Sequence, residues 1–310
     1  MPAAYGFTAY GGPQVQRFLD LPRPVPGPGE LLVEVCAAGV NPVDWKVRAG
    51  MHRAFLPLDL PAVLGREVAG VVVQLGPDAD QFAVGDPVFG TNDRGCGGYA
   101  RFALLTTSRT ALKPAAVSWT DAAVLPVAAG TAYDGIGRLA PKAGESLLIL
   151  GIGGGVGVAA AQLACDAGVS VFGTATAAKR EFVASLGATA IAYDSDDFGE
   201  RLRKALPDGA DAILDLVGGD ALRSVAPVIS MGCRILTVAA PETAARFGGR
   251  PLSRASTTET LTELARRVAD ERFNPRVSGA FRFEDAGSAL AEVESGHPWG
   301  KVALDLRGDH

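Results

Sequence analysis

Ser146-Leu147-Leu148-Ile149-Leu150-Gly151-Ile152-Gly153-Gly154-Gly155-Val156-Gly157 is an apolar run that turns on glycines into a small-residue helix reaching Ala164. The run Leu147 to Leu150 has no polar alternation, as expected of a parallel strand buried on both faces. The glycines let the backbone bring N–H groups close to a pyrophosphate, whose charge suits the positive end of the following helix. An ordinary glycine-rich turn would show the same letters, so the surrounding pattern has to decide.

A second predicted strand, Val169 to Gly173, follows after one helix length and completes a strand-helix-strand unit. An NAD site would place Asp or Glu at the end of this strand, to bind the adenosine ribose. Residues 174–180 instead contain hydroxyls, two cations and no carboxylate. Because a 2′-phosphate needs donors and positive charge, we predict NADPH, with contacts from Thr174, Thr176 and Lys179. The alternative is that Lys179 and Arg180 only open a solvated helix face.

Length and composition narrow the class of protein. A chain of 310 residues with 48% hydrophobic content can bury a large core, and two domains are expected. The net charge of -5 argues against a general nucleic-acid surface. No apolar stretch approaches the roughly 20 residues of a membrane helix, and the N-terminus lacks the pattern of an export signal. We therefore expect a cytoplasmic protein with no membrane or nucleic-acid partner.

The sequence contains few cysteine and histidine residues, and their spacing forms no known motif. Four cysteines are scattered without a CxxC pair, and the chain has three histidines. Neither a disulfide framework nor a structural zinc site is supported by this pattern. We predict no metal site.

The chain changes texture near residue 120. The part before it is rich in proline and glycine and predicts a compact, largely antiparallel β domain with short strands at Leu31 to Val35, Val68 to Leu75, Pro87 to Phe89 and Tyr99 to Ala103. After residue 120, strands and helices alternate, and the strands are predicted at Leu147 to Leu150, Val169 to Gly173, Ala188 to Ala192, Ala212 to Leu216 and Arg234 to Val238. This alternation predicts an α/β fold with a doubly wound parallel sheet.

The last third predicts a loop at Ala239 to Thr257 and an amphipathic helix from Thr258 to about Arg272. A strand at Ser278 to Phe283, a helix at Glu284 to Glu294 and a final strand at Lys301 to Leu306 follow. The final strand has no obvious place in the doubly wound sheet, so we assign it to the first domain. The expected domains are residues 1–120 with 278–310, and residues 121–277.

Several segments resemble, in order, those of the medium-chain dehydrogenase/reductase superfamily, in particular its zinc-free quinone oxidoreductase branch, which includes zeta-crystallin-like reductases. They are Gly39-Val40-Asn41-Pro42-Val43-Asp44-Trp45-Lys46, Gly65-Arg66-Glu67-Val68-Ala69-Gly70, Val84-Gly85-Asp86-Pro87-Val88-Phe89-Gly90, Gly97-Gly98-Tyr99-Ala100, Ala129-Gly130-Thr131-Ala132-Tyr133, Gly154-Gly155-Val156-Gly157, Leu216-Val217-Gly218-Gly219 and Gly296-His297-Pro298-Trp299-Gly300-Lys301-Val302. The resemblance implies a Rossmann domain joined to a GroES-like, mainly antiparallel catalytic domain.

The resemblance also implies what the site lacks. Where zinc-dependent relatives carry their metal ligands, this chain has Asn41, Arg66 and, as aligned, Val127. None of these residues can coordinate zinc directly in that arrangement. Alcohol dehydrogenation without a Lewis acid loses its mechanism, so reduction of a quinone or of the C=C bond of an α,β-unsaturated carbonyl becomes the expected activity.

Three residues are the predicted catalytic group: Lys46, Asn41 and Asp44. Lys46, expected in a loop, would stabilise the developing enolate oxygen, since relatives carry Tyr or Lys there. Asn41 is predicted to bind the nicotinamide ribose or the substrate, or else to form the turn before Pro42. Asp44 is more consistent with holding a backbone N–H than with a general base. Trp45 is predicted in the substrate pocket, with a core role as the alternative.

The predicted cofactor contacts combine the glycine loop with residues that the resemblance implies. They are Thr131, Gly151, Gly153, Gly154, Gly155, Val156, Gly157, Thr174, Thr176, Lys179, Tyr193, Val217, Gly218, Val238, Ala239, Ala240 and Phe281. An exposed aromatic cap is the alternative for Tyr193.

Two other functions stay open: a biosynthetic enoyl reductase acting on a polyketide-like intermediate, and a low-turnover NADPH-binding sensor or structural protein. The expected partner is a small-molecule quinone or enone, and relatives commonly form homodimers through an edge of the cofactor sheet.

Overall fold

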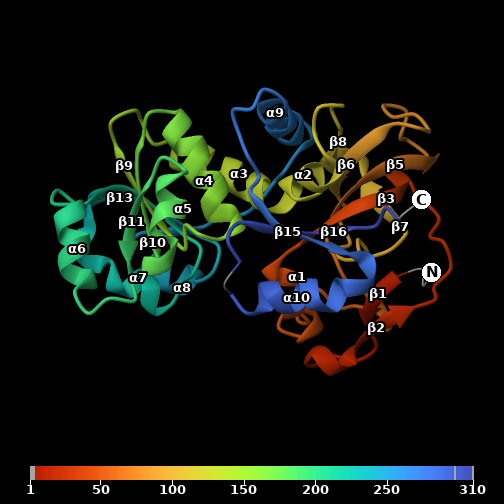
Figure 1. Cartoon of the computed structure of the whole chain (residues 1–310), viewed down its shortest axis with the longest axis horizontal. Helices are drawn as coiled ribbons and strands as arrows, with labels where there is room; N and C mark the ends of the chain where they lie inside the picture. The colour runs from red at the N-terminus through yellow and green to blue at the C-terminus, as the bar shows by residue number, and fades with distance from the viewer. Residues whose placement is uncertain (1–3, 297, 309–310) are drawn as a thin grey trace. The chain divides into compact units, whose positions relative to one another are not determined.

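The computed structural model describes residues 4–296 and 298–308, and His297, which the sequence places in a tail turn, lies outside them (Figure 1). The chain folds into two units. The first combines the chain up to Val127 with the chain from Ser256 onward, and the second is Ala128–Ala255. The second unit is therefore an insertion between two parts of the first.

The second unit is built on a six-stranded parallel sheet with the order β11-β10-β9-β12-β13-β14. Its strands are β9 (Ser146–Leu150), β10 (Ser170–Ala175), β11 (Thr189–Ala192), β12 (Ala210–Asp215), β13 (Ile229–Thr237) and β14 (Arg250–Pro251). Its helices are α3 (Gly130–Leu139), α4 (Gly155–Asp166), α5 (Arg180–Ala184), α6 (Phe198–Ala205), α7 (Asp220–Ser224) and α8 (Pro241–Ala245). This order confirms the predicted doubly wound sheet of the Rossmann type.

Burial explains why β9 lies in the middle of that sheet. Leu147, Leu148, Ile149 and Leu150 have no exposed surface, since β10 and β12 flank the strand. Helix α4 packs on β9 and β10 through its small residues. Four leucine and isoleucine side chains buried in this way contribute about 1.5–3 kcal/mol each to folding.

The first unit contains one small and one large sheet. β1 (Ala4–Phe7), β2 (Gln16–Leu19) and β4 (Ala62–Val63) form the small one. The large sheet has the strands β3 (Glu30–Val40), β5 (Glu67–Leu75), β6 (Pro87–Thr91), β7 (Phe102–Thr106), β8 (Thr110–Leu112), β15 (Val277–Arg282) and β16 (Lys301–Asp305). Among the described strand pairs of this sheet only β15–β16 is parallel, which confirms a mainly antiparallel domain.

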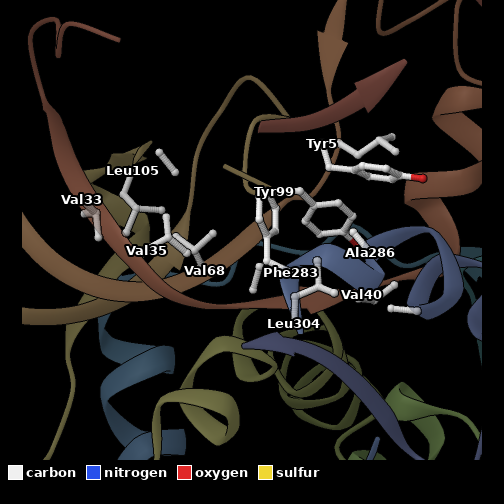
Figure 2. Close-up of a cluster of buried hydrophobic side chains, with 14 of the residues drawn as sticks. Tyr5, Val33, Val35, Val40, Val68, Tyr99, Leu105, Phe283, Ala286 and Leu304 are labelled. Carbon is white, nitrogen blue, oxygen red and sulfur yellow. The ribbon is translucent and has the colours of Figure 1, made fainter. Parts of the chain in front are cut away.

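The core of the first unit gathers side chains from both ends of the chain (Figure 2). Tyr5 and Val33 come from early strands, whereas Phe283, Ala286 and Leu304 come from the C-terminal part. Strand β16 pairs with β3, as predicted for the last strand. The C-terminal segment is therefore part of the first unit's structure and not an appendage.

The α-helices in the described part of the first unit are α1 (Pro42–Arg48), α2 (Trp119–Ala123), α9 (Thr258–Ala269) and α10 (Ala286–Glu294). Helix α9 packs against β8 and the turn Thr107–Arg109, where the Thr258 hydroxyl donates to the carbonyl of Thr107 at 3.1 Å. The second boundary between the units, where the chain returns to the first unit, therefore falls at 255/256, earlier than the expected 277/278. The first boundary falls at 127/128, later than the expected 120/121.

Three local expectations differ from the structure. The predicted loop Ala239 to Thr257 contains α8 and the sixth strand, β14, which are too short to give a periodic pattern. The strand predicted at Tyr99 to Ala103 begins at Phe102, because the Tyr99 amide and carbonyl bond to Leu64 and Tyr5 of other segments. Lys46, expected in a loop, lies on α1.

Candidate functional site

The glycine loop of the second unit has the backbone geometry that glycine requires. Gly151 directly follows β9 and has φ +83°, in the left-handed region that side chains disfavour. A Cβ built on Gly157 would lie 2.5 Å from the Gly151 carbonyl oxygen and 2.6 Å from Ile152 Cα. The loop leads into α4, whose N-cap is Gly154. The close approach of helix and loop leaves the first-turn N–H groups of α4 available to an anion.

Lys179 lies across this loop. A Cβ at Gly153 would be 2.8 Å from Lys179 Cδ and 3.2 Å from its Nζ. Burial lowers the pKa of Lys179 from its ordinary value, because the half-buried ammonium has lost part of its hydration. The structure therefore brings this predicted cation to the glycine loop, as a bound phosphate would require.

The two threonines of the predicted 2′-phosphate site differ in their surroundings. Thr174 is buried, and its hydroxyl oxygen accepts the N–H of Gly151 at 3.1 Å. Its side chain therefore holds the loop to β10, and only its own O–H remains to donate. Thr176 is half-buried and precedes the turn Ala177–Lys179.

A carboxylate that sequence reasoning did not anticipate also lies at this edge. Asp194 Oδ1 accepts the N–H of Ala177 at 3.0 Å, just beyond the end of β10. Asp194 follows the exposed Tyr193, whose N–H bonds to the carbonyl of Ala175. The parallel pairing of β10 with β11 carries these residues to the same end of the sheet, and that pairing could have revealed the contact.

Two buried polar residues shape the carboxyl ends of β12 and β13. Asp215 Oδ1 accepts the N–H groups of Val217 at 3.0 Å and Gly218 at 2.7 Å. Its Oδ2 accepts the hydroxyl of Thr237 at 2.7 Å, and the oxygen of that hydroxyl accepts the N–H groups of residues 239 and 240. Asp215 and Thr237 were not among the predicted site residues, although Asp215 stands in the quoted strand.

Apolar side chains are exposed next to these hydrogen bonds of Asp215 and Thr237, at the edge where open parallel sheets bind ligands. Val217 and Val238 are both exposed, although large apolar side chains are normally buried. Gly218 has φ +80°, and a Cβ there would lie 2.9 Å from that of Ala240. Thr131 is half-buried near the start of α3 in the same unit. Phe281 belongs to β15 of the first unit, where it packs against that unit's core.

In the first unit, α1 is fixed at both ends. The Asn41 N–H donates to Asp44 Oδ2 at 2.9 Å, and the Tyr99 hydroxyl donates to the same oxygen at 2.8 Å. Arg48 closes the last turn, with two bonds to the Glu294 carboxylate at 3.0 and 2.8 Å. Burial raises the pKa of Asp44 to about 6, even though both hydrogen bonds favour its charged form. Asp44 thus holds a backbone N–H, the role that fits its residue type better than general base.

A buried ion pair lies beside the start of α1. Lys301 Nζ donates to Glu67 Oε1 at 2.9 Å, to Asn41 Oδ1 at 2.6 Å and to the Val40 carbonyl at 3.1 Å. Asn41 Nδ2 donates to Glu67 Oε1 at 2.8 Å, and the Val127 N–H donates to Glu67 Oε2 at 2.6 Å. Glu67 is fully buried and Lys301 is 4% exposed. The amide of Asn41 is therefore engaged on both sides within the protein.

Sequence reasoning missed this network, which joins residues separated by up to 261 positions. One local signal was present: Glu67 pairs with Gly39 across β3 and β5, and a Cβ at Gly39 would lie within van der Waals overlap of the Glu67 carboxylate. A glycine opposite a glutamate in two apolar strands indicates a buried charge that needs room.

The positions that align with the zinc ligands of relatives do not form a zinc site in the described structure. Among residues 4–296 and 298–308, no three His, Cys, Asp or Glu side chains are placed to hold a metal ion. Asn41 and the Val127 N–H are both bound to Glu67, and the Lys301 ammonium lies at the same carboxylate. A cation that already neutralises Glu67 leaves no anionic donor set for Zn²⁺. These residues do not fit a zinc ion.

Lys46 and Trp45 are neighbours on α1 with different surroundings. Lys46 is half-buried, and its Nζ lies 5.7 Å from the centre of the Trp45 ring. Trp45 packs against the core of the first unit. No described acidic side chain forms an ion pair with Lys46, so its ammonium is available to an oxygen of a ligand.

Two further observations concern the surface of the second unit and the helices of the described chain. A surface hollow of about 200 Å³ lies between β11 and α6, which carry none of the predicted site residues. Across the described part of the chain, no helix has both the length and the apolar character to cross a membrane.

Comparison with known proteins places the chain in a family. Residues 27–115 match the alcohol dehydrogenase GroES-like domain, and residues 186–304 match a domain described as zinc-binding dehydrogenase. A 2-methylene-furan-3-one reductase of Solanum lycopersicum is 32% identical over 97% of this chain and 78% of its own length. A chloroplast envelope quinone oxidoreductase homolog of Arabidopsis thaliana is 29% identical over 97% and 98%.

Structural comparison agrees. The solved quinone oxidoreductase of Coxiella burnetii superposes with a TM-score of 0.90 at 30% identity, over 98% of this chain and 99% of that one. The chain belongs to the medium-chain dehydrogenase/reductase superfamily, in its quinone oxidoreductase branch. It is an oxidoreductase that uses a nicotinamide cofactor, and the glycine cradle of the second unit fits such a dinucleotide.

Proposed function

We propose that this protein is a zinc-independent, NADPH-dependent reductase of a quinone or of the C=C bond of an α,β-unsaturated carbonyl compound. The observation that supports it most is the half-buried Lys46 on a helix fixed at both ends, with no acidic partner in the described structure. Two relatives, named 2-methylene-furan-3-one reductase and quinone oxidoreductase homolog, point to the same substrate classes.

The proposed chemistry needs stabilisation of an oxygen anion. A bound reduced nicotinamide supplies a hydride, and the carbonyl oxygen of the acceptor then gains negative charge. We assign the stabilisation of that charge to the Lys46 ammonium, because α1 carries it without a competing carboxylate in the described structure. The product is completed by a proton, so that one NADPH and one proton convert the enone to the saturated ketone and NADP⁺.

The choice of NADPH rests on Lys179 beside Gly153. Its ammonium can pair with a 2′-phosphate, which NADH lacks. Asp194 opposes this preference, since a carboxylate near the end of β10 is typical of sites that bind the ribose hydroxyls. The Lys179 side chain lies directly beside Gly153 of the glycine loop, so we favour NADPH.

The test is oxidation of NADPH and of NADH by the purified protein against a panel of simple quinones, alkenals and enones. The proposal expects oxidation of NADPH with at least one acceptor class, without added metal and with undiminished rate after chelation. Tight NADPH binding without oxidation by any acceptor would instead support a binding protein with little turnover. A rate restored only by zinc would contradict the assignment.

A further inference from the structure

Arg66 is a cation without a partner in the described structure. Its side chain is half-buried, and its Nε is buried and has no hydrogen-bond acceptor. The guanidinium lies against Gly95: a Cβ there would be 3.4 Å from Cζ and Nη2 and 3.6 Å from Nη1. Gly95 has φ +67°, and its N–H donates to Asn92 Oδ1 at 2.8 Å. The loop at Gly95 therefore packs beside the guanidinium of Arg66.

Two more basic side chains share this region. Burial lowers the pKa of His52, and Arg66 and Lys46 each lower it further, so both cations lie within electrostatic reach of His52. The Met51 N–H donates to the Lys46 carbonyl at 3.0 Å and so ties the His52 segment to α1. His52 Nδ1 is buried and also has no partner. Two buried polar atoms without partners point to a ligand group that is not part of the chain.

The acidic group that faces this cluster is already occupied. Asp44 is electrostatically coupled to Arg66, but its Oδ2 accepts the Asn41 N–H and the Tyr99 hydroxyl. No described carboxylate forms an ion pair with Arg66. Arg66 and Lys46 are two cations against the one carboxylate of Asp44, so the cluster keeps a net positive charge in a partly buried setting, where an anion would be held more strongly than in water.

An apolar surface adjoins the cluster. Met51 and Phe55 are both well exposed, and the Phe55 ring centre lies 4.8 Å from that of His52. Exposed large side chains beside a cationic group suit an organic anion with a carbon skeleton better than an inorganic ion.

We propose that Arg66, flanked by Lys46 and His52, binds a carboxylate of the substrate, so that the preferred substrates are acidic α,β-unsaturated carbonyl compounds. This inference rests on the proposed function. In it Lys46 serves the carbonyl oxygen and Arg66 a second, charged end of the same molecule. Arg66 is then a residue that determines specificity, since its planar fork matches a carboxylate.

The test compares (E)-4-oxopent-2-enoate with its neutral methyl ester, in the wild type and in Arg66→Met, Arg66→Lys and Arg101→Met. Arg66→Met is expected to lower the ratio of kcat/KM for acid over ester by roughly 10- to 100-fold, mainly through KM for the acid. Arg66→Lys should recover part of that ratio. Arg101, an exposed partner of Glu34, is the matched control, and its variant should keep the wild-type ratio.

The outcomes separate this inference from the proposed function. If acid and ester are both reduced and Arg66→Met leaves their ratio unchanged, the inference is wrong while the function stands. An equal rise of KM for NADPH with both substrates would assign Arg66 to the cofactor and overturn it as well. If neither compound is reduced, calorimetric binding of 4-oxopentanoate decides: weaker binding by Arg66→Met than by the wild type supports the site, and equal binding refutes it.

Discussion

Lys46 stands on α1 between two fixed ends, so its removal should leave the helix in place. We expect Lys46→Met to lower kcat by roughly 5- to 150-fold, or about 1–3 kcal/mol of transition-state stabilisation. NADPH affinity should hardly change, because the glycine loop belongs to the second unit. Steady-state kinetics and NADPH titration check this, with the exposed Lys142→Met as control. Normal turnover with weakened NADPH binding would contradict the role.

Asp44 predicts a pH dependence of stability. Its folded pKa of about 6 lies above its unfolded value, so the folded state binds the proton more tightly. Its contribution is therefore favourable at low pH and is lost as pH rises through roughly 4 to 6, by about 3 kcal/mol in total. Asp44→Asn keeps an oxygen acceptor and should flatten this dependence relative to the wild type, as urea unfolding between pH 4 and 7 would show. Parallel curves for both proteins would refute it.

The position of Lys179 leads to a prediction about the preference for NADPH over NADH. Lys179→Ala should raise KM for NADPH by at least about 10-fold while KM for NADH changes little, because the 2′-phosphate loses its cation. Asp194→Asn should act oppositely and improve NADPH relative to NADH, since it removes a negative charge near the end of β10. Equal loss of both cofactors in Lys179→Ala would remove the 2′-phosphate argument.

At the level of elements, the Glu67–Lys301 pair joins β5, β16 and the start of α1. Lys301→Met leaves a buried carboxylate without its cation and should destabilise the fold by about 3–5 kcal/mol. Adding Glu67→Gln should recover part of that loss, because the unpaired charge disappears. Urea unfolding measures both, and Arg101→Met, which breaks an exposed pair, should cost less than about 1 kcal/mol. A double variant less stable than Lys301→Met would contradict this coupling.

The elements that the sequence predicted well are those with strong local patterns. Leu147 to Leu150 and the glycines after it gave the central strand, the loop and α4 within a residue or two. Helix α1 was missed because its seven residues are too few for a periodic signal and begin at Pro42. Helix α9 was found but assigned to the other unit, since its packing on β8 depends on tertiary contacts.

The site was predicted in the same uneven way. Lys179 could be proposed from the sequence because it follows a strand end at a known distance from the glycines. The partners of Asn41 could not, because Glu67 and Lys301 meet it only after three strands have paired. Asp194 escaped notice because its approach to β10 depends on the β10–β11 register.

At the scale of the whole molecule, the second unit's sheet has an open edge along β13 at which a second copy of the chain could pair. β14 pairs with β13 only at Leu236 and Thr237, so in the described structure residues 229–235 lack a strand partner on that side. Met231 on this edge is fully exposed. We expect a dimer that pairs this edge with a second copy.

Light scattering after gel filtration tests the dimer. Met231→Lys should shift the wild-type dimer toward monomer, because a charge on the edge opposes strand pairing. Val84→Lys, at an exposed valine of the first unit, should leave the mass unchanged. A monomeric wild type, or dimers in both variants, would exclude this interface.

Because the second unit is inserted in the first, its residues are all synthesised before the C-terminal part of the first unit. Residues 128–255 leave the ribosome before strand β16 and helix α10 exist. Until then Glu67 has no ammonium beside it and Arg48 has no carboxylate to bind. The second unit can therefore mature first, whereas the unit that carries Lys46 must wait until α10 and β16 have been synthesised.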